Sequence, residues 1–427
     1  MAVTDFTIVA RSLTGRAFST VVTALTVCVG VCLVLTLLSM RDAGDKAFAR
    51  GTGNMDFLIS RDAGEIASVL NGIFYADVPN APINIAELDG LVPLARAPFE
   101  YLIPTQLGDS YRGRSVMATV PEFFTSFEPN QGRPLAFAEG RAFVKKSESP
   151  FEIVAGADAA SSLGLSIGDV IALSHGGPRE ESHVHTEYQY EVVGILEPTL
   201  TPHDRALFTE LTSAWILHAV DDSEGLETLA TEADIQERHR QITGVYARLA
   251  RRPGTTGRPA NFQSAFEAIR RSGQYTIAEP NAQIAALFRI VGNVNAILLA
   301  LAIAVLISSG ITLMLALYNT MEQRRRQIAV LRVLGCSRGR IFGLVLTESA
   351  ILGTAGAIAG VLLSLFASVV VSRSLAQAVG VVVEPSLPVR ETLSVVVGAI
   401  VLAALAGLIP ALTAYRTPVI RNLRPIG

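Results

Sequence analysis

The chain has 427 residues, of which 50% are hydrophobic and 17% are charged, and its formal net charge at pH 7 is −3. Average globular proteins carry about 25% charged residues, so this composition excludes both an ordinary soluble enzyme and a disordered chain. The near-neutral charge gives no reason to expect a nucleic-acid partner. Hydrophobic residues gather in long runs near the N-terminus and in the last third, which predicts a membrane protein with one large water-exposed domain.

The apolar runs are long enough for four membrane crossings, since a transmembrane helix needs about 20 apolar residues. The first run is longer than the roughly 7–15 apolar residues of a secretory signal, so we expect a retained span. The helical pattern of the second run begins near Pro280. A helix from there to residue 318 is longer than the roughly 30 Å of hydrocarbon, and its surplus is expected to project outward as a stalk.

These patterns predict an α-helical membrane protein with four transmembrane helices and a large α+β extracytoplasmic domain between the first and the second. The expected segments are an N-terminal segment (1–20), the first transmembrane helix (21–40), the extracytoplasmic domain (41–285), the stalk with the second transmembrane helix (286–318), a cytoplasmic loop (319–340), the third helix (341–371), an outer loop (372–392), the fourth helix (393–412) and a tail (413–427).

The orientation follows from basic residues, because cytoplasmic loops carry an excess of Lys and Arg. The loop 319–340 holds six arginines against one acid, Glu322, and the tail 413–427 holds three arginines and no acid. We therefore expect this loop, the tail and both termini in the cytoplasm. The domain 41–285 is then expected on the opposite side of the membrane.

The domain 41–285 has a mixed pattern of alternating and helical hydrophobic spacing. Its expected elements are strands at 55–60, 168–173 and 188–196 and helices at 213–220 and 262–271, capped by Thr212 and Asn261. We expect an α+β domain of two subdomains, with the stretch 97–203 inserted in the first.

Motifs that would carry chemistry are missing from the sequence. There is no phosphate-binding loop, no nucleophile elbow and no His-Glu-x-x-His zinc motif. His183 and His185 stand two residues apart beside Glu181 and Glu187, and a strand would place both imidazoles on one face. Two histidines alone are a weak signal, so we favour a polar loop there. We expect no catalytic, cofactor or metal site, and hence no enzyme.

One acid, Glu348, lies inside an apolar span, about seven residues from its expected cytoplasmic end. An ionisable residue inside a membrane span suggests a functional role as the first hypothesis. Because an acid near the end of a span can reach the membrane–water interface, we favour a structural role. Glu348 would then pair with an arginine such as Arg332 or Arg340, or cap backbone groups. Small residues in the same span, among them Gly356 and Gly360, would allow close packing in a bundle or at a dimer seam.

The segment 321–348 carries a resemblance to a known family. It reads MEQRRRQIAVLRVLGCSRGRIFGLVLTE, which resembles the E-x-R-x-x-E-I-A-x-L-R-A-x-G-(A/C)-S signature of FtsX/MacB-like permeases of ABC transporters and the glutamate that follows it. Gln327 and Val333 depart from that signature without changing the helical pattern. The chain also resembles the MacB-type periplasmic core domain and the family's C-terminal ending at several short motifs: 132–134, 155–156, 163–169, 192–196, 407–411, 415–418 and 423–424.

The resemblance implies a dimeric permease whose partner ATPase, in two copies, supplies the missing phosphate loop. No cofactor is then expected on this chain, and ATP and Mg²⁺ belong to the ATPase. The cytoplasmic loop would form a coupling helix that docks the ATPase through arginines and an apolar stripe. The residues expected in that contact are Glu322, Arg324, Arg325, Arg326, Ile328, Leu331, Arg332, Leu334, Gly335 and Ser337.

The function expected from this resemblance is export or extraction of an amphipathic cargo, such as a peptide, lipoprotein, lipid or drug, by mechanotransmission from a bacterial inner membrane. A first alternative is an FtsX-like transenvelope regulator that activates an outer partner such as a cell-wall hydrolase. A second is a membrane sensor without an ATPase. Further expected partners are a second permease subunit, identical or paralogous, a periplasmic adaptor or hydrolase, and membrane lipid.

Overall fold

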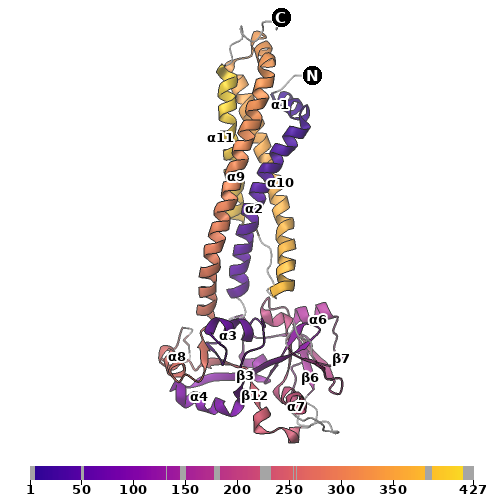
Figure 1. Cartoon of the computed structure of the whole chain (residues 1–427), viewed down its shortest axis with the longest axis vertical. Coiled ribbons are helices and arrows are strands. Elements are labelled where there is room, and N and C mark those ends of the chain that lie inside the picture. Colours follow the sequence, from indigo (N-terminus) through magenta and orange to yellow (C-terminus); the bar gives the residue numbers. More distant parts are fainter. Residues whose placement is uncertain are drawn as a thin grey trace. The chain divides into compact units, whose positions relative to one another are not determined.

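The computed structural model describes residues 5–49, 52–130, 132–144, 151–176, 183–221, 232–252, 254–255, 257–379 and 387–416. The chain forms two compact units. One, here called the helix bundle, comprises 1–44, 291–374 and 384–427, and the other, here called the globular domain, comprises 45–290 and 375–383. Figure 1 colours the elements of both units along the sequence.

The globular domain is built on one large mixed sheet, which confirms the predicted α+β class. In the described residues its strands are β1 (Phe57–Ser60), β3 (Phe99–Tyr111), β4 (Arg114–Thr119), β5 (Phe137–Gly140), β6 (Glu152–Ala155), β7 (Val170–Ile171), β8 (Ser174–His175), β9 (His183–Val184), β10 (Tyr190–Leu196), β11 (Leu207–Glu210), β13 (Gly244–Leu249) and β14 (Thr276–Ala278). A separate two-stranded sheet pairs β2 (Ile83–Asn84) with β12 (Gln241–Ile242).

The main path through the sheet is β14-β1-β13-β3-β4-β11-β6-β10-β5. Strands from the two ends of the domain's sequence form one side of this path, and strands from 114–210 form the other. Most neighbours are antiparallel, whereas β11 with β4 and β6 with β10 are parallel. The strands from the middle of the domain's sequence therefore continue the same sheet as the strands from the beginning and the end of that sequence. The expectation of two subdomains stays a prediction.

Helices flank this sheet. They are α3 (Glu65–Gly72), α4 (Leu88–Ala95), α5 (Glu122–Ser126), α6 (Ala157–Leu163), α7 (Leu211–Asp221) and α8 (Phe262–Arg271). The predicted helix 262–271 is confirmed, but its expected cap is wrong, because the Asn261 side chain makes no capping hydrogen bond. Thr212 lies inside α7, and the Glu210 carboxylate accepts its backbone N–H at 2.7 Å.

The predicted strand 168–173 is much shorter in the structure, where only Val170 and Ile171 pair. Gly168 has a φ of +88°, which places it in the left-handed region that favours glycine. The Asp169 carboxylate accepts the backbone N–H of Ser166 at 2.7 Å. Both features make the turn from which the short strand is entered.

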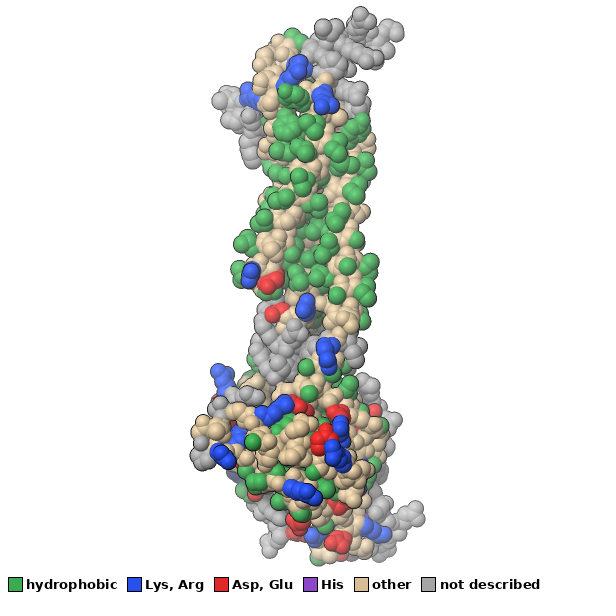
Figure 2. Space-filling view, turned by 90° about the vertical axis from the view of Figure 1, so that its left-hand side faces the viewer, with side chains coloured by type: hydrophobic (Ala, Val, Ile, Leu, Met, Phe, Trp, Pro, Cys, Tyr) green, Lys and Arg blue, Asp and Glu red, His purple; other side chains and the backbone are tan. Residues whose placement is uncertain are grey.

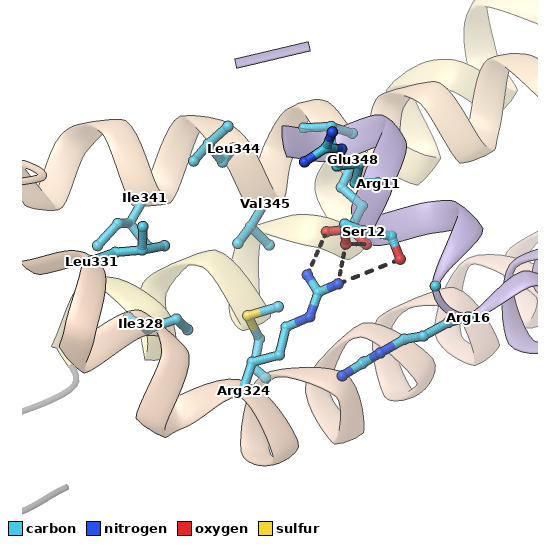
Figure 3. Close-up of a pocket in the computed structure, with 13 residues that line it drawn as sticks. Arg11, Ser12, Arg16, Arg324, Ile328, Leu331, Ile341, Leu344, Val345 and Glu348 are labelled. Carbon is cyan, nitrogen blue, oxygen red and sulfur yellow. Dashed lines mark hydrogen bonds and ion pairs between the residues drawn. The ribbon is translucent and has the colours of Figure 1, made fainter. Parts of the chain in front are cut away.

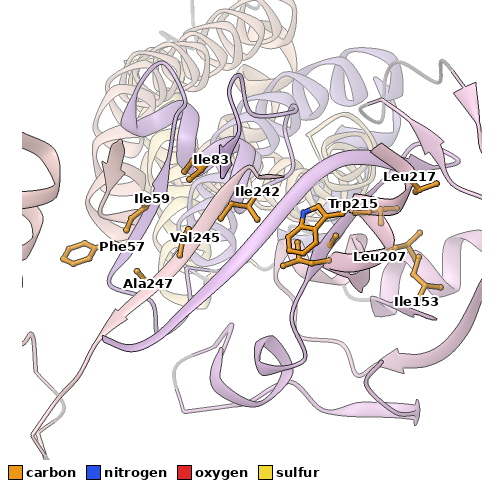
Figure 4. Packing of buried hydrophobic residues seen from close by; sticks show 14 of the residues in the cluster. Phe57, Ile59, Ile83, Ile153, Leu207, Trp215, Leu217, Ile242, Val245 and Ala247 are labelled. Atoms are coloured by element: carbon orange, nitrogen blue, oxygen red, sulfur yellow. The ribbon is translucent and has the colours of Figure 1, made fainter. Parts of the chain in front are cut away.

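One hydrophobic cluster of the globular domain runs along one face of the sheet (Figure 4). Phe57 and Val245 are fully buried there, and the rings of Phe57 and Phe262 lie 4.6 Å apart. Trp215 of α7 packs in the same cluster, and its indole N–H donates to the backbone oxygen of Gln241 at 2.7 Å. Burial of side chains of this size stabilises by about 1.5–3 kcal/mol each, so this cluster holds the two halves of the sheet together.

The helix bundle contains the four predicted membrane crossings. Its helices are α1 (Asp5–Thr14), α2 (Ala17–Ala49), α9 (Pro280–Val333), α10 (Arg338–Val379) and α11 (Val389–Arg416). Four of them contain apolar stretches long enough to span a membrane. Large hydrophobic side chains such as Leu301, Phe366 and Leu405 are exposed along them, and Figure 2 shows this apolar surface. Exposed apolar side chains at this density fit lipid rather than water as the surrounding medium.

Glycines of α10 bring it close to α2. A Cβ atom on Gly356 would lie 2.8 Å from the Val27 Cβ, and one on Gly360 would lie 2.7 Å from the Val31 Cβ. Neither position has room for a side chain, so these small residues serve packing inside one bundle. The buried residues Leu35, Ala357 and Ala399 join the same contact between α2, α10 and α11.

Candidate functional site

The candidate site lies at the end of the bundle where α9 turns into α10. Gly335, with a φ of +94°, ends α9 in a Schellman motif. Its N–H donates to the Arg332 oxygen, and the Cys336 N–H donates to the Leu331 oxygen at 3.0 Å. Ser337 then starts α10, because its hydroxyl accepts the N–H of Arg340 at 3.2 Å. The turn between the two helices is therefore short and well defined.

A cavity of about 420 Å³ opens beside this turn, between α1, α9 and α10. One end of it is apolar and the other polar, as Figure 3 shows. Its lining includes Arg11, Ser12, Arg16, Arg324, Ile328, Leu331, Ile341, Leu344, Val345 and Glu348.

The polar end of the cavity is organised by an ion pair between the buried Glu348 and the half-buried Arg324. Arg324 Nη1 lies 3.4 Å from Glu348 Oε2, and the Ser12 hydroxyl donates to Glu348 Oε1 at 3.0 Å. Arg324 also contacts the Ser12 side chain. Residues from α1, α9 and α10 thus share one polar contact, which links the N-terminal helix to the bundle.

Arg16 lies near the same contact, in the turn between α1 and α2. Burial and the positive charge of Arg324 lower the pKa of Arg16, and the negative charge of Glu348 opposes this effect. Because an arginine stays protonated at any physiological pH, the shift marks proximity rather than a change of charge. Arg16 thus adds positive charge to the polar end of the cavity, where the ion pair of Glu348 is with Arg324.

The partner of Glu348 differs from the one expected from the sequence. We expected Arg332 or Arg340, whereas the structure pairs Glu348 with Arg324. Arg324 precedes Glu348 by 24 residues. The turn folds α10 back along α9, so a residue well before the turn on α9 lies level with one well after it on α10. Arg332 and Arg340 flank the turn and lie closer to the helix ends.

The residues expected to contact an ATPase are divided between the cavity and the surface. Arg324, Ile328 and Leu331 line the cavity. Leu334, Gly335, Ser337 and Arg326 are exposed, and Arg332 is half-buried. The side chains of Glu322 and Arg325 lie outside the described part of the chain.

The expected apolar stripe is only partly on the surface. Ile328 is 6% exposed and packs against Ile341 and Val345 of α10, so it does not face outward. Leu334 is 77% exposed, and Val333 is 63% exposed at the end of α9. The apolar surface at the turn is therefore made by residues after Ile328, in the last turn of the helix.

Two residues of the site, Ser12 and Arg16, were missed by the sequence analysis. They belong to a segment that carried no assigned element. Phe6, Val9 and Leu13 are spaced as on one face of a helix. That spacing was the signal from which α1 could have been predicted, and Val9 is indeed 2% exposed.

The histidine pair that we expected in a polar loop lies in an ordered region. His183 belongs to β9, which pairs with β8, so the loop expectation is wrong at this residue. His185 is 1% exposed, and its Nδ1 lies 3.3 Å from Glu187 Oε1. The side chain of His183 and all of Glu181 lie outside the described residues.

Fold and site together define a class of protein. Four apolar helices, a large α+β domain between the first and the second, and a basic turn between α9 and α10 describe a multi-pass membrane protein.

Family models identify this protein more closely. The model of the MacB-like periplasmic core domain matches residues 20–252, which is more than half of the chain, and the model of the FtsX-like permease C-terminal domain matches residues 299–419. The chain belongs to the FtsX/MacB-like permease family, and the resemblance seen in the sequence is confirmed. A search of curated proteins finds no match. Permeases of this family are membrane subunits of ABC transporters, which implies an ATPase partner.

Proposed function

We propose that this permease transmits ATP-driven movement from a separate ATPase to its globular domain, and that this movement exports or extracts an amphipathic cargo such as a peptide, lipoprotein, lipid or drug. Two ATPase copies and two permease subunits would form the working complex. ATP and Mg²⁺ would bind on the ATPase, since this sequence has no phosphate-binding loop. The proposed orientation places the turn 334–337 in the cytoplasm and the globular domain outside.

The observation that carries this proposal is the length of α9. It runs for 54 residues without a break, from Pro280 to Val333. At 1.5 Å per residue this is about 81 Å, against about 30 Å of hydrocarbon. One helix therefore includes residues of the globular domain at its start and adjoins the basic turn at its end. A continuous helix of this kind can carry a displacement between the two regions.

The turn itself supports a contact with an ATPase. Val333 and Leu334 present exposed apolar surface, and Arg326, Arg338 and Arg340 are exposed nearby. Apolar residues surrounded by arginines are typical of a protein interface. The same arginines also suit the cytoplasmic face of a membrane.

A break in α9 tests the transmission. Ala285 is exposed, so its replacement by proline removes one backbone hydrogen bond and kinks the helix at a cost of about 3 kcal/mol without disturbing side-chain packing. The readout is hydrogen exchange of the globular domain in the complex with its ATPase, with and without ATP. We expect the ATP-dependent change to vanish in Ala285→Pro, to persist in the control Ala285→Ser, and the ATPase to remain bound in both.

Two outcomes would contradict the proposal. An ATP-dependent change that is equal in Ala285→Pro and Ala285→Ser would show that α9 does not carry the movement. A wild-type globular domain that never responds to ATP would remove mechanotransmission altogether. If the movement is present but a cell-wall hydrolase rather than a cargo responds to it, the FtsX-like regulator is the correct function.

A further inference from the structure

Three side chains of the globular domain converge near the place where β8 pairs with β3. Asp109 lies on β3, His175 lies on the neighbouring strand β8, and His218 lies in the last turn of α7. Asp109 and His175 are register partners in the antiparallel pair β3–β8. One ligand atom from each of the three residues lies within 4.8 Å of the other two.

The distances suit a metal ion with short bonds to nitrogen and oxygen. In a tetrahedral zinc site with bonds of about 2.0–2.1 Å, two ligand atoms lie about 3.3 Å apart. His175 Nδ1 and Asp109 Oδ1 are 3.3 Å apart, and the rings of His175 and His218 lie 5.3 Å apart, edge to face. His218 offers a ligand atom within 4.8 Å of the other two, so binding of an ion would require its ring to move closer.

Burial of the carboxylate also favours a bound cation. Asp109 is 6% exposed, and its ion-pair partner among the described residues is His175. A buried carboxylate is costly unless positive charge compensates it. A protonated His175 would supply that charge, and so would a divalent cation held between the two groups.

A fourth residue, Gln106, contacts the ring of His218. It is 3% exposed, its amide nitrogen lies 2.9 Å from His218 Nδ1, and its Oε1 has no hydrogen-bond partner in the described part of the chain. The oxygen and nitrogen of an amide exchange places by a half rotation. With Oε1 turned toward the ring it would accept the Nδ1 proton, which fixes the tautomer that leaves Nε2 as ligand, as outer partners of metal-bound histidines commonly do.

We propose that Asp109, His175 and His218 bind one divalent transition-metal ion of the zinc type, with Gln106 orienting His218. Two imidazoles and one carboxylate are a ligand set that zinc accepts, and a fourth position stays open to water or to another ligand. The ion would join β3, the β8–β9 hairpin and α7, three elements brought together from distant parts of the sequence. The inference concerns the globular domain alone and stands independently of the proposed transport function.

Binding of Zn²⁺ to the full-length permease tests this site. The protein is purified in detergent without a histidine tag, stripped with a chelator and titrated with Zn²⁺ against a competing dye. Since thiols also bind zinc, every variant carries Cys336→Ser, which removes the cysteine that is not buried. We expect one high-affinity Zn²⁺ per chain.

Matched variants assign that ion to the proposed residues. Asp109→Asn and His218→Gln should each weaken Zn²⁺ binding by more than 10-fold, and Gln106→Leu should weaken it by about 10- to 100-fold. His239→Gln, which removes another buried histidine of the same domain, should leave binding unchanged. Equal affinities for His218→Gln and His239→Gln would overturn the proposal.

X-ray absorption is measured on the zinc-loaded parent protein. Its result therefore does not depend on whether the substituted variants fold. It should show two imidazole ligands and one oxygen ligand from the chain. A spectrum with sulfur ligands, or a protein that retains no zinc after dialysis, would equally overturn it.

Discussion

Loss of the Glu348 charge should loosen the contact between α1 and the rest of the bundle. Glu348→Gln keeps the size of the side chain and an oxygen for the Ser12 hydroxyl, but it removes the ion pair with Arg324. Breaking a fully buried pair costs about 3–5 kcal/mol, because one charge remains uncompensated. Arg324 is 17% exposed at its side chain and lines a cavity, so it can turn partly toward water. We therefore expect a loss of about 2 kcal/mol, as for a hydrogen bond to a charged group.

The assay is the free energy of unfolding of the bundle in mild detergent, with hydrogen exchange of α1 as a local readout. Glu391→Gln, at an exposed acid of α11, is the matched control and should change stability by less than about 0.5 kcal/mol. Arg324→Gln with Glu348→Gln should cost less than the sum of the single variants, because the pair is then removed as a whole. Additive costs, or a Glu348→Gln protein as stable as Glu391→Gln, would refute the structural role of this ion pair.

Three further predictions concern the turn and the helix packing. Leu334→Asp should abolish co-purification of the ATPase, whereas Val170→Asp, at another exposed apolar residue in the globular domain, should leave it intact. Gly335→Ala should cost about 1–2 kcal/mol in a thermal unfolding assay from its left-handed backbone alone, since a Cβ there meets no other atom. Gly360→Ala should cost about 1–3 kcal/mol by crowding Val31. Gly343→Ala on the same helix should be neutral or stabilising by up to about 1 kcal/mol, and equal stabilities would contradict the close packing of α2 and α10.

The membrane-spanning helices could be predicted because their signal is local. A run of about 20 apolar residues specifies a crossing whatever surrounds it, and the start of α9 at Pro280 followed from the proline alone. The strand order of the globular domain could not be predicted, because it depends on pairing between residues far apart in the sequence, such as Leu58 with Tyr246.

The side-chain contacts of the candidate site could not be predicted for the same reason, because they join residues from different helices. The family resemblance implied a helix in the loop 319–340, but it could not show that α9 continues to Val333 or that Ile328 turns inward against α10. The pairing of Glu348 with Arg324 and Ser12 depends on how three helices meet. The histidines near residue 185 attracted attention by their spacing, whereas the cluster with Asp109 uses His175 and His218, which no short motif connects.

The central claim is that this permease works with a separate ATPase, and its most direct test is purification of the tagged chain from its native membrane in mild detergent, followed by mass spectrometry of the proteins that accompany it. We expect an ABC ATPase in a one-to-one ratio with the permease, and any third protein will indicate a cargo, an adaptor or a hydrolase. An intact, dimeric permease that carries no ATPase would contradict the account and favour a membrane sensor.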